Sequence, residues 1–256
     1  MLTGGPSLYE AKRSLHPRTI CLPSAVDTDH YALDASRIDS EQAAHAASLQ
    51  GPTHRVRLGF FGVIDERFDV PLLARMAEAE PDWEFVMVGP VVKIDPAALP
   101  RHPNIRWLGQ QPYDFLPYLI ADWDICLMPF AMNESTRFIS PTKTLEYLAA
   151  GKPIVSTPVR DVVDMFGDIV RVAPDAAGFL QACRDILALD PAERRRAASV
   201  AEMRARQHSW EGAASIAREA VAEALRQRPS GLRHESLAAP EGAPPADDLP
   251  QVASAA

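Results

Sequence analysis

The sequence has few cysteines, and no two of them lie close together in the chain. Cys21, Cys126 and Cys183 are the three thiols among 256 residues, and none occurs at CxxC or metal-ligand spacing. An odd number of widely separated cysteines excludes a disulfide framework and indicates reduced thiols. The 7 histidines also show no metal-ligand spacing. Neither residue type therefore indicates a metal site.

Basic residues and long apolar runs are scarce as well. The chain has 26 Lys and Arg residues against 34 Asp and Glu residues, which gives a net charge of -8. This balance argues against a general nucleic-acid binder, which would carry a basic patch or stripe. No apolar stretch approaches the roughly 18 residues needed to span a bilayer, and the N-terminal segment lacks the apolar region of a secretory signal. We therefore expect a cytoplasmic protein, a compartment that includes the inner face of the membrane.

Composition divides the chain into three regions. Residues 1–52 are mixed, with a short apolar run followed by an Ala-rich stretch of linker character. Residues 229–256 are dominated by Pro, Ala, Ser and acidic residues, a composition typical of disorder. Between them, residues 53–228 alternate between short apolar runs and amphipathic stretches. The expected strands are 55–62, 83–89, 104–108, 124–129, 153–156 and 169–172, and the expected helices are 70–78, 113–121, 141–150, 159–165, 175–188, 191–206 and 209–226.

This alternation predicts βαβ units and a parallel sheet. Two of the expected strands end in glycine, at Gly62 and Gly89. That ending fits a doubly wound fold, in which ligands bind outside the carboxyl ends of the strands. We therefore predict one Rossmann-like α/β domain of about 175 residues, with helices on both faces of a parallel sheet.

The stretch from Ser140 to Gly151 carries the strongest helix-boundary signals. Ser140 is a favourable N-cap residue, and Pro141 is favourable at the first helical position. Gly151 follows the last periodic residue and suits the left-handed conformation at a helix C-terminus. Lys143 and Glu146 are three residues apart and therefore share a helix face.

A helix N-terminus binds anions because it offers unpaired N–H groups and the positive end of the helix dipole. The dipole disfavours a lysine in the first turn, so Lys143 makes sense there if a diphosphate docks beside it. Glu146, one turn deeper, is placed to accept hydrogen bonds from ribose hydroxyls. The alternative is that Lys143 and Glu146 form a surface pair worth a few tenths of a kcal/mol.

The run from Ser140 to Thr157, SPTKTLEYLAAGKPIVST, resembles the donor-site signature of GT-B glycosyltransferases of the retaining, glycogen-synthase-like group. The resemblance implies that Glu146 binds the donor ribose. It also places Lys143 and the start of its helix, with Ser140, Thr142 and Thr144, at the donor diphosphate. Further segments are similar to other parts of the same domain in the same order, namely 59–62, 83–89, 104–109, 124–130 and 209–211.

Other candidate donor contacts lie after the predicted strands. The resemblance implies that Gly62 approaches the phosphates, and Gly89 closes the neighbouring strand. Arg67 can approach a phosphate bidentately. Asp65 and Glu66 beside it are expected to form a loop salt bridge that orients Arg67, rather than a pair of acid–base carboxylates. Lys93 follows Gly89 and is a further candidate for contact with the donor. The remaining candidate, the tyrosine at position 113, lies beside the base pocket or caps a helix.

The sequence departs from the family pattern in three places. The loop after the first strand usually offers Arg and Lys, whereas here it offers only Arg67. A glutamate often stands eight residues before the ribose-binding one, whereas here that position holds Phe138. The sugar and the stereochemical outcome are therefore left open. The acceptor-binding N-terminal half of the GT-B fold is mostly missing, and residues 6–13 look like its last helix. We therefore expect a separate N-terminal acceptor domain as a partner.

The resulting prediction is a glycosyltransferase that passes a sugar from a nucleotide-diphosphate sugar to a glycan, lipid or small-molecule acceptor. Arg67 and Lys143 would stabilise the charge that develops on the leaving diphosphate, so no metal ion or other cofactor is expected. Two alternatives are a non-catalytic or truncated nucleotide-sugar-binding module and a nucleotide-sugar epimerase of the same fold. The Arg194-Arg195-Arg196 run is interpreted as a solvated helix face rather than a contact with an anionic membrane.

Overall fold

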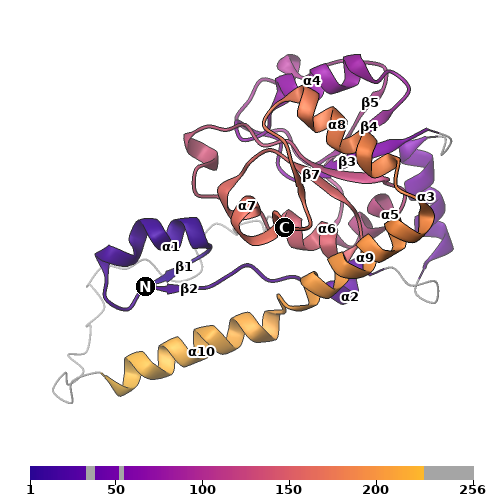
Figure 1. The fold of residues 1–256 in the computed structure, drawn as a ribbon. Coiled ribbons are helices and arrows are strands. Elements are labelled where there is room, and N and C mark those ends of the chain that lie inside the picture. The colour runs from indigo at the N-terminus through magenta and orange to yellow at the C-terminus, as the bar shows by residue number, and fades with distance from the viewer. Residues whose placement is uncertain (33–37, 52–54, 228–256) are drawn as a thin grey trace, which may run out of the picture.

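The computed structural model describes residues 1–32, 38–51 and 55–227 (Figure 1). The predicted disordered region, 229–256, lies outside the described residues. Six parallel strands form the main sheet in the order β5-β4-β3-β6-β7-β8. This is the strand order of the doubly wound dinucleotide-binding fold. The strands are β3 (Arg57–Phe61), β4 (Glu84–Val88), β5 (Ile105–Gly109), β6 (Ile125–Met128), β7 (Ile154–Ser156) and β8 (Arg171–Val172).

Helices cover both faces of this sheet. On one face lie α4 (Val70–Ala79) and α8 (Ala176–Leu187), and the other carries α3 (Ser40–Gln50), α5 (Leu116–Ala121), α6 (Thr142–Ala149) and α9 (Pro191–Arg206) (Figure 1). The shorter elements are α2 (Thr28–Tyr31), α7 (Arg160–Phe166), η2 (Pro96–Ala98), η3 (Tyr113–Phe115) and η4 (Glu134–Thr136). The predicted Rossmann-like α/β architecture is therefore confirmed, with boundaries within a few residues of those expected. None of the described helices is long and apolar enough to cross a membrane.

The central strands are apolar throughout because both of their faces are covered. Successive side chains of a strand point to opposite faces. Accordingly, Phe60 joins the core beneath α4 and α8, whereas Phe61 joins the core beneath α5, α6 and α9. Gly59 of β3 is needed for packing, since a Cβ atom there would lie 2.0 Å from the Trp123 ring.

The first 32 residues and the last helix lie together beside the sheet. β1 (Leu2–Thr3) pairs in parallel with β2 (Ile20–Cys21), and α1 (Pro6–Lys12) and η1 (Arg13–Leu15) connect them. Helix α10 (Trp210–Arg226) extends from the main body alongside this unit (Figure 1). A hydrogen bond of 2.9 Å from Arg18 to Gln227 joins the two segments. Tyr31 and Ala46, from the region predicted as a linker, contribute to the core of the sheet domain.

Candidate donor-binding site

The carboxyl ends of β3 and β6 form the point at which the strand order reverses, where doubly wound folds bind ligands. Gly62 follows β3 and Gly89 follows β4, with φ angles of 144° and 137°. A Cβ atom on Gly89 would lie 1.9 Å from the Gly62 carbonyl oxygen, and the Gly62 N–H donates to Val88 at 2.8 Å. The two loops thus approach so closely that glycine is required at both positions.

Helix α6 begins at Thr142, with Pro141 as its N-cap. The prediction that Ser140 caps this helix is therefore wrong. Ser140 instead packs beneath the N-terminal segment, because a Cβ atom on Gly5 would lie 2.7 Å from the Ser140 Cβ atom. No side chain caps α6, so its first turn keeps backbone N–H groups for another acceptor. At the other end, Gly151 adopts a φ of 65°, as predicted for a left-handed C-terminal residue.

Lys143 projects from the first turn of α6 across the end of β3. A Cβ atom on Gly62 would lie 2.0 Å from the Lys143 Cε atom, and the ammonium lies 5.8 Å from the centroid of the Phe61 ring. Among the described residues, no hydrogen bond or ion pair satisfies this ammonium, so the alternative of a Lys143–Glu146 surface pair is wrong. Burial lowers the pKa of Lys143, and nearby Arg67 lowers it further, while Glu146 opposes both.

Arg67 is held at the same edge by Asp65. Its Nε atom lies 3.0 Å from both carboxylate oxygens of Asp65, and Nη2 lies 2.6 Å from Oδ2. Asp65 is 2% exposed, whereas the Arg67 side chain is 40% exposed. The predicted orienting salt bridge is thus confirmed. The Asp65 salt bridge raises the pKa of Arg67, whereas the positive charge of Arg67 lowers the pKa of Lys143 at the same end of the sheet.

Glu146 has a neighbour that the sequence analysis missed. Tyr31, from α2, is 2% exposed, and its hydroxyl lacks a hydrogen-bond partner among the described residues, as does the buried Oε2 atom of Glu146. Burial raises the pKa of Glu146, and Lys143 and Tyr31 counteract this effect. The carboxylate therefore has unused acceptor capacity in a partly desolvated place. Asp27 caps α2, the short helix that carries Tyr31.

The other predicted site residues have different surroundings. Tyr113 is the first residue of η3, so it does not cap a helix. The residue is 46% exposed, and its ring stacks on the His30 ring with the centroids 4.0 Å apart. Lys93 has an exposed side chain that pairs with Glu66 at 3.4 Å. Thr144 is 0% exposed and its hydroxyl faces the sulfur of Met128 at 3.5 Å, so it points into the core. The predicted contact between its side chain and a ligand is not supported by this geometry.

Within the described residues, no group of three or more His, Cys, Asp or Glu side chains is arranged to hold a metal ion. Two Asp-x-Asp sequences occur in the chain, at 27–29 and 122–124, and the structure gives them other roles. Asp27 caps α2 through two backbone N–H groups, and Asp124 accepts the backbone N–H of Arg57 at 2.8 Å. The positive charge at the carboxyl edge thus comes from Arg67 and Lys143.

Comparison with proteins of known structure supports the fold. The chain is similar to sucrose-phosphate synthase from Thermosynechococcus elongatus, with 17% identity and a TM-score of 0.66 over 88% of this chain and 58% of the other. It is also similar to Alr3699/HepE of Anabaena, solved in complex with UDP-glucose, with 15% identity and a TM-score of 0.66 over 88% and 63% of the two chains. These matches confirm the predicted similarity to GT-B glycosyltransferase structures.

Sequence comparison identifies the family. TuaH of Bacillus subtilis strain 168, which is named for a glycosyltransferase of teichuronic acid biosynthesis, is 34% identical over 121 residues, or 46% of this chain and 30% of TuaH. The chain thus spans less than a third of the length of this curated relative. The family model described as "Glycosyl transferases group 1" matches residues 57–189, which is more than half of the chain and includes β3, α6 and both candidate cations. The chain therefore belongs to the group 1 family of glycosyl transferases.

Proposed function

We propose that this chain supplies the donor-binding half of a glycosyltransferase that uses a nucleoside-diphosphate sugar. The observation that carries the proposal is Lys143, an ammonium without a hydrogen-bonding or ionic partner among the described residues, held against the glycine-closed end of β3. A diphosphate there would accept hydrogen bonds from Lys143, from Arg67 and from the uncapped first turn of α6. These groups would stabilise the charge that develops on the leaving diphosphate during sugar transfer.

The ribose of the donor would lie one helical turn from the phosphates. Glu146 follows Lys143 on the same face of α6, and its buried carboxylate oxygen lacks a partner among the described residues. Ribose hydroxyls are donors that would satisfy this oxygen. Tyr113, stacked on His30, offers the other face of its ring to a nucleobase. A nucleotide laid along these residues would run from Arg67 at the phosphates to Tyr113 at the base.

Uridine nucleotides are the first ligands to test, because HepE of Anabaena was solved with UDP-glucose. Isothermal titration calorimetry should give tighter binding of UDP than of UMP by about tenfold or more, since UMP lacks the second phosphate. Lys143→Met should remove most of this preference. Equal affinities of UDP and UMP would contradict the diphosphate assignment, and GDP and ADP test the choice of base.

Product analysis separates glycosyl transfer from the two alternatives. Incubation with UDP-glucose and candidate acceptors should release UDP together with a glycosylated product, and NMR of that product gives its stereochemistry. Binding without release of UDP would favour a nucleotide-sugar-binding module that is not catalytic by itself and needs a separate acceptor domain. A sugar nucleotide with inverted configuration would favour an epimerase. None of the matched proteins named above is an epimerase.

A further inference from the structure

A second cleft lies at the opposite edge of the sheet, away from the carboxyl ends of the strands. Its volume is about 630 Å³, within the usual range for small-molecule sites. Asp124, Pro153 and Val170 line it, and they directly precede β6, β7 and β8, respectively. Helix α9 and the C-terminal end of α8 close its other side. The cleft is therefore separate from the donor site.

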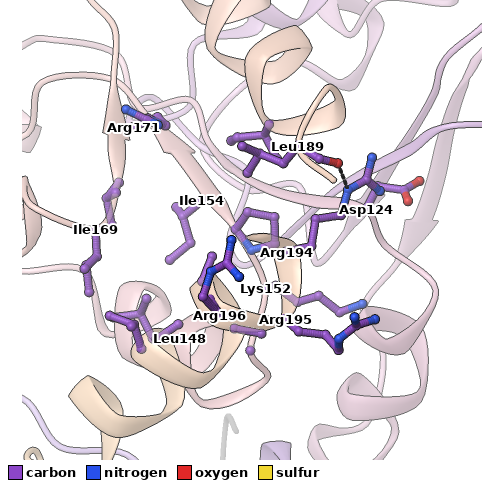
Figure 2. A pocket seen from close by; sticks show the side chains of 18 of the residues that line it. Asp124, Leu148, Lys152, Ile154, Ile169, Arg171, Leu189, Arg194, Arg195 and Arg196 are labelled. Carbon is purple, nitrogen blue, oxygen red and sulfur yellow. Dashed lines mark hydrogen bonds between the residues drawn. The ribbon is translucent and has the colours of Figure 1, made fainter. Parts of the chain in front are cut away.

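The lining of this cleft combines an apolar floor with arginines. Apolar side chains come from the strand ends and from α6, α8 and α9, and they include Leu148, Ile154, Ile169, Ile186, Leu187 and Val200. In Figure 2, Arg196 of α9 lies beside Ile154, Arg195 lies on the other side beside Lys152, and Arg171 lies farther along the rim. A solvated helix face, as the sequence suggested for this arginine run, would not require an apolar hollow next to it.

The charges in the cleft are unequally compensated. Arg194 is used structurally, because its guanidinium donates to the carbonyl oxygens of Leu187 and Leu189 at the end of α8 (Figure 2). The lining acids are also occupied: Asp168 pairs with Arg204, and Asp124 accepts a backbone N–H. Arg171, Arg195 and Arg196, all exposed, form no hydrogen bond or ion pair within the part of the chain that the structure describes.

Three unpaired guanidinium groups beside an apolar hollow match one kind of ligand. Arginine binds phosphate bidentately, and the hollow removes an apolar group from water. The local excess of positive charge occurs in a chain whose net charge is -8, so it is not a consequence of overall composition. We propose that this cleft binds a small anionic amphiphile, namely a phosphate ester with an apolar chain.

Calorimetry with octyl phosphate, below its micelle concentration, tests this proposal. The protein should bind one octyl phosphate, with inorganic phosphate and octanol each bound at least about tenfold more weakly, because each lacks half of the interaction. Saturating UDP should leave the affinity unchanged. Displacement of octyl phosphate by UDP would overturn the proposal, since it would place the ligand in the donor site. Equal affinity for inorganic phosphate would overturn it as well.

Matched variants identify the residues. The double variant R195A/R196A should lose about tenfold or more in affinity, because each arginine contributes charged hydrogen bonds. Arg206→Ala is the control, since Arg206 is exposed on the same helix but does not line the cleft. Val200→Ser, at a residue 47% exposed, tests the apolar contact with little risk to folding and should weaken octyl phosphate but not inorganic phosphate. Unchanged affinity in R195A/R196A, or equal losses in R206A, would refute the assignment.

Discussion

Lys143→Met is the substitution that best separates a binding role from a structural one. Methionine keeps the length of the side chain beside Gly62 and Phe61 and removes the charge. In the free protein the ammonium has no hydrogen-bond or ion-pair partner among the described residues, so its loss should change the free energy of unfolding by less than about 1 kcal/mol. With a diphosphate bound, the loss of charged hydrogen bonds should cost about 1.5–3 kcal/mol, or roughly 10- to 150-fold in the Kd of UDP.

The pH dependence of stability gives this prediction a second readout. Burial lowers the pKa of Lys143 in the folded protein, so the charged form costs stability relative to the unfolded chain. That cost is fully present below the folded pKa and disappears as the pH rises toward the unfolded value of about 10.4. Wild type should therefore gain stability relative to Lys143→Met over this window in urea unfolding. A difference that does not change with pH would show that the ammonium is not desolvated.

Lys152→Met is the matched control, because Lys152 is also a partly buried lysine whose pKa is lowered by desolvation. Its ammonium donates to the carbonyl oxygens of Ala121 and Trp123 at 2.7 and 2.8 Å, away from the donor edge. Its loss should lower the free energy of unfolding by about 1–3 kcal/mol and leave UDP affinity unchanged. The donor-site assignment of Lys143 is refuted if both variants bind UDP like wild type, or if both lose affinity equally.

Three further substitutions, with Gly109→Ala as a control for one of them, test the site and the fold. Burial raises the pKa of Glu146, so its ionised form lowers the stability of the folded protein. Glu146→Gln should therefore be more stable than wild type at pH 7 in urea unfolding. This difference should shrink as the pH falls toward about 4.3, where the glutamate is protonated in both states. The same variant should bind UDP more weakly, and a stability lower than that of wild type would contradict the burial argument. Gly62→Ala should cost about 1–3 kcal/mol in thermal unfolding and weaken UDP, because its Cβ atom would meet Lys143 at 2.0 Å. Gly109→Ala, at a φ of 66° with open space around it, isolates the backbone part of that cost, and equal losses would exclude the steric part. Arg57→Met removes one of the two arginines that pair with the buried carboxylate of Glu84, the other being Arg106, and should lower the free energy of unfolding by about 3 kcal/mol, or roughly 6–12 °C in Tm, whereas a shift below about 2 °C would contradict it.

The strands could be predicted from the sequence because burial on both faces makes them short apolar runs that end at glycine. Gly62 and Gly89 were also informative, because the close approach of their two loops and their positive φ angles favour glycine at these positions. The Asp65–Arg67 salt bridge was also predictable, because both partners belong to one short loop. Local chemistry and local geometry decide such features, and both can be read along the chain.

Features that depend on contacts between distant segments could not be predicted in the same way. Ser140 has the chemistry of an N-cap residue, but packing against Gly5 takes it out of that role. Thr144 lies within the signature, yet the rotation of α6 turns its hydroxyl toward Met128. Tyr31 reaches Glu146 from a region that looked like a linker, and no local pattern indicates which side chain a linker places in a site.

Cations without a hydrogen-bond or ion-pair partner among the described residues lie at both the carboxyl and the amino ends of the strands of the sheet. Arg57 and Arg67 show that this chain pairs its cations closely where stability or orientation requires it. Lys143 at the carboxyl ends of the strands and the exposed Arg195 and Arg196 near their amino ends have no such partner among the described residues. A desolvated or clustered cation without a partner lowers stability and is compensated only when an anion binds. Both edges should therefore respond to anions by a rise in Tm, and the carboxyl edge should do so for UDP even in the R195A/R196A variant.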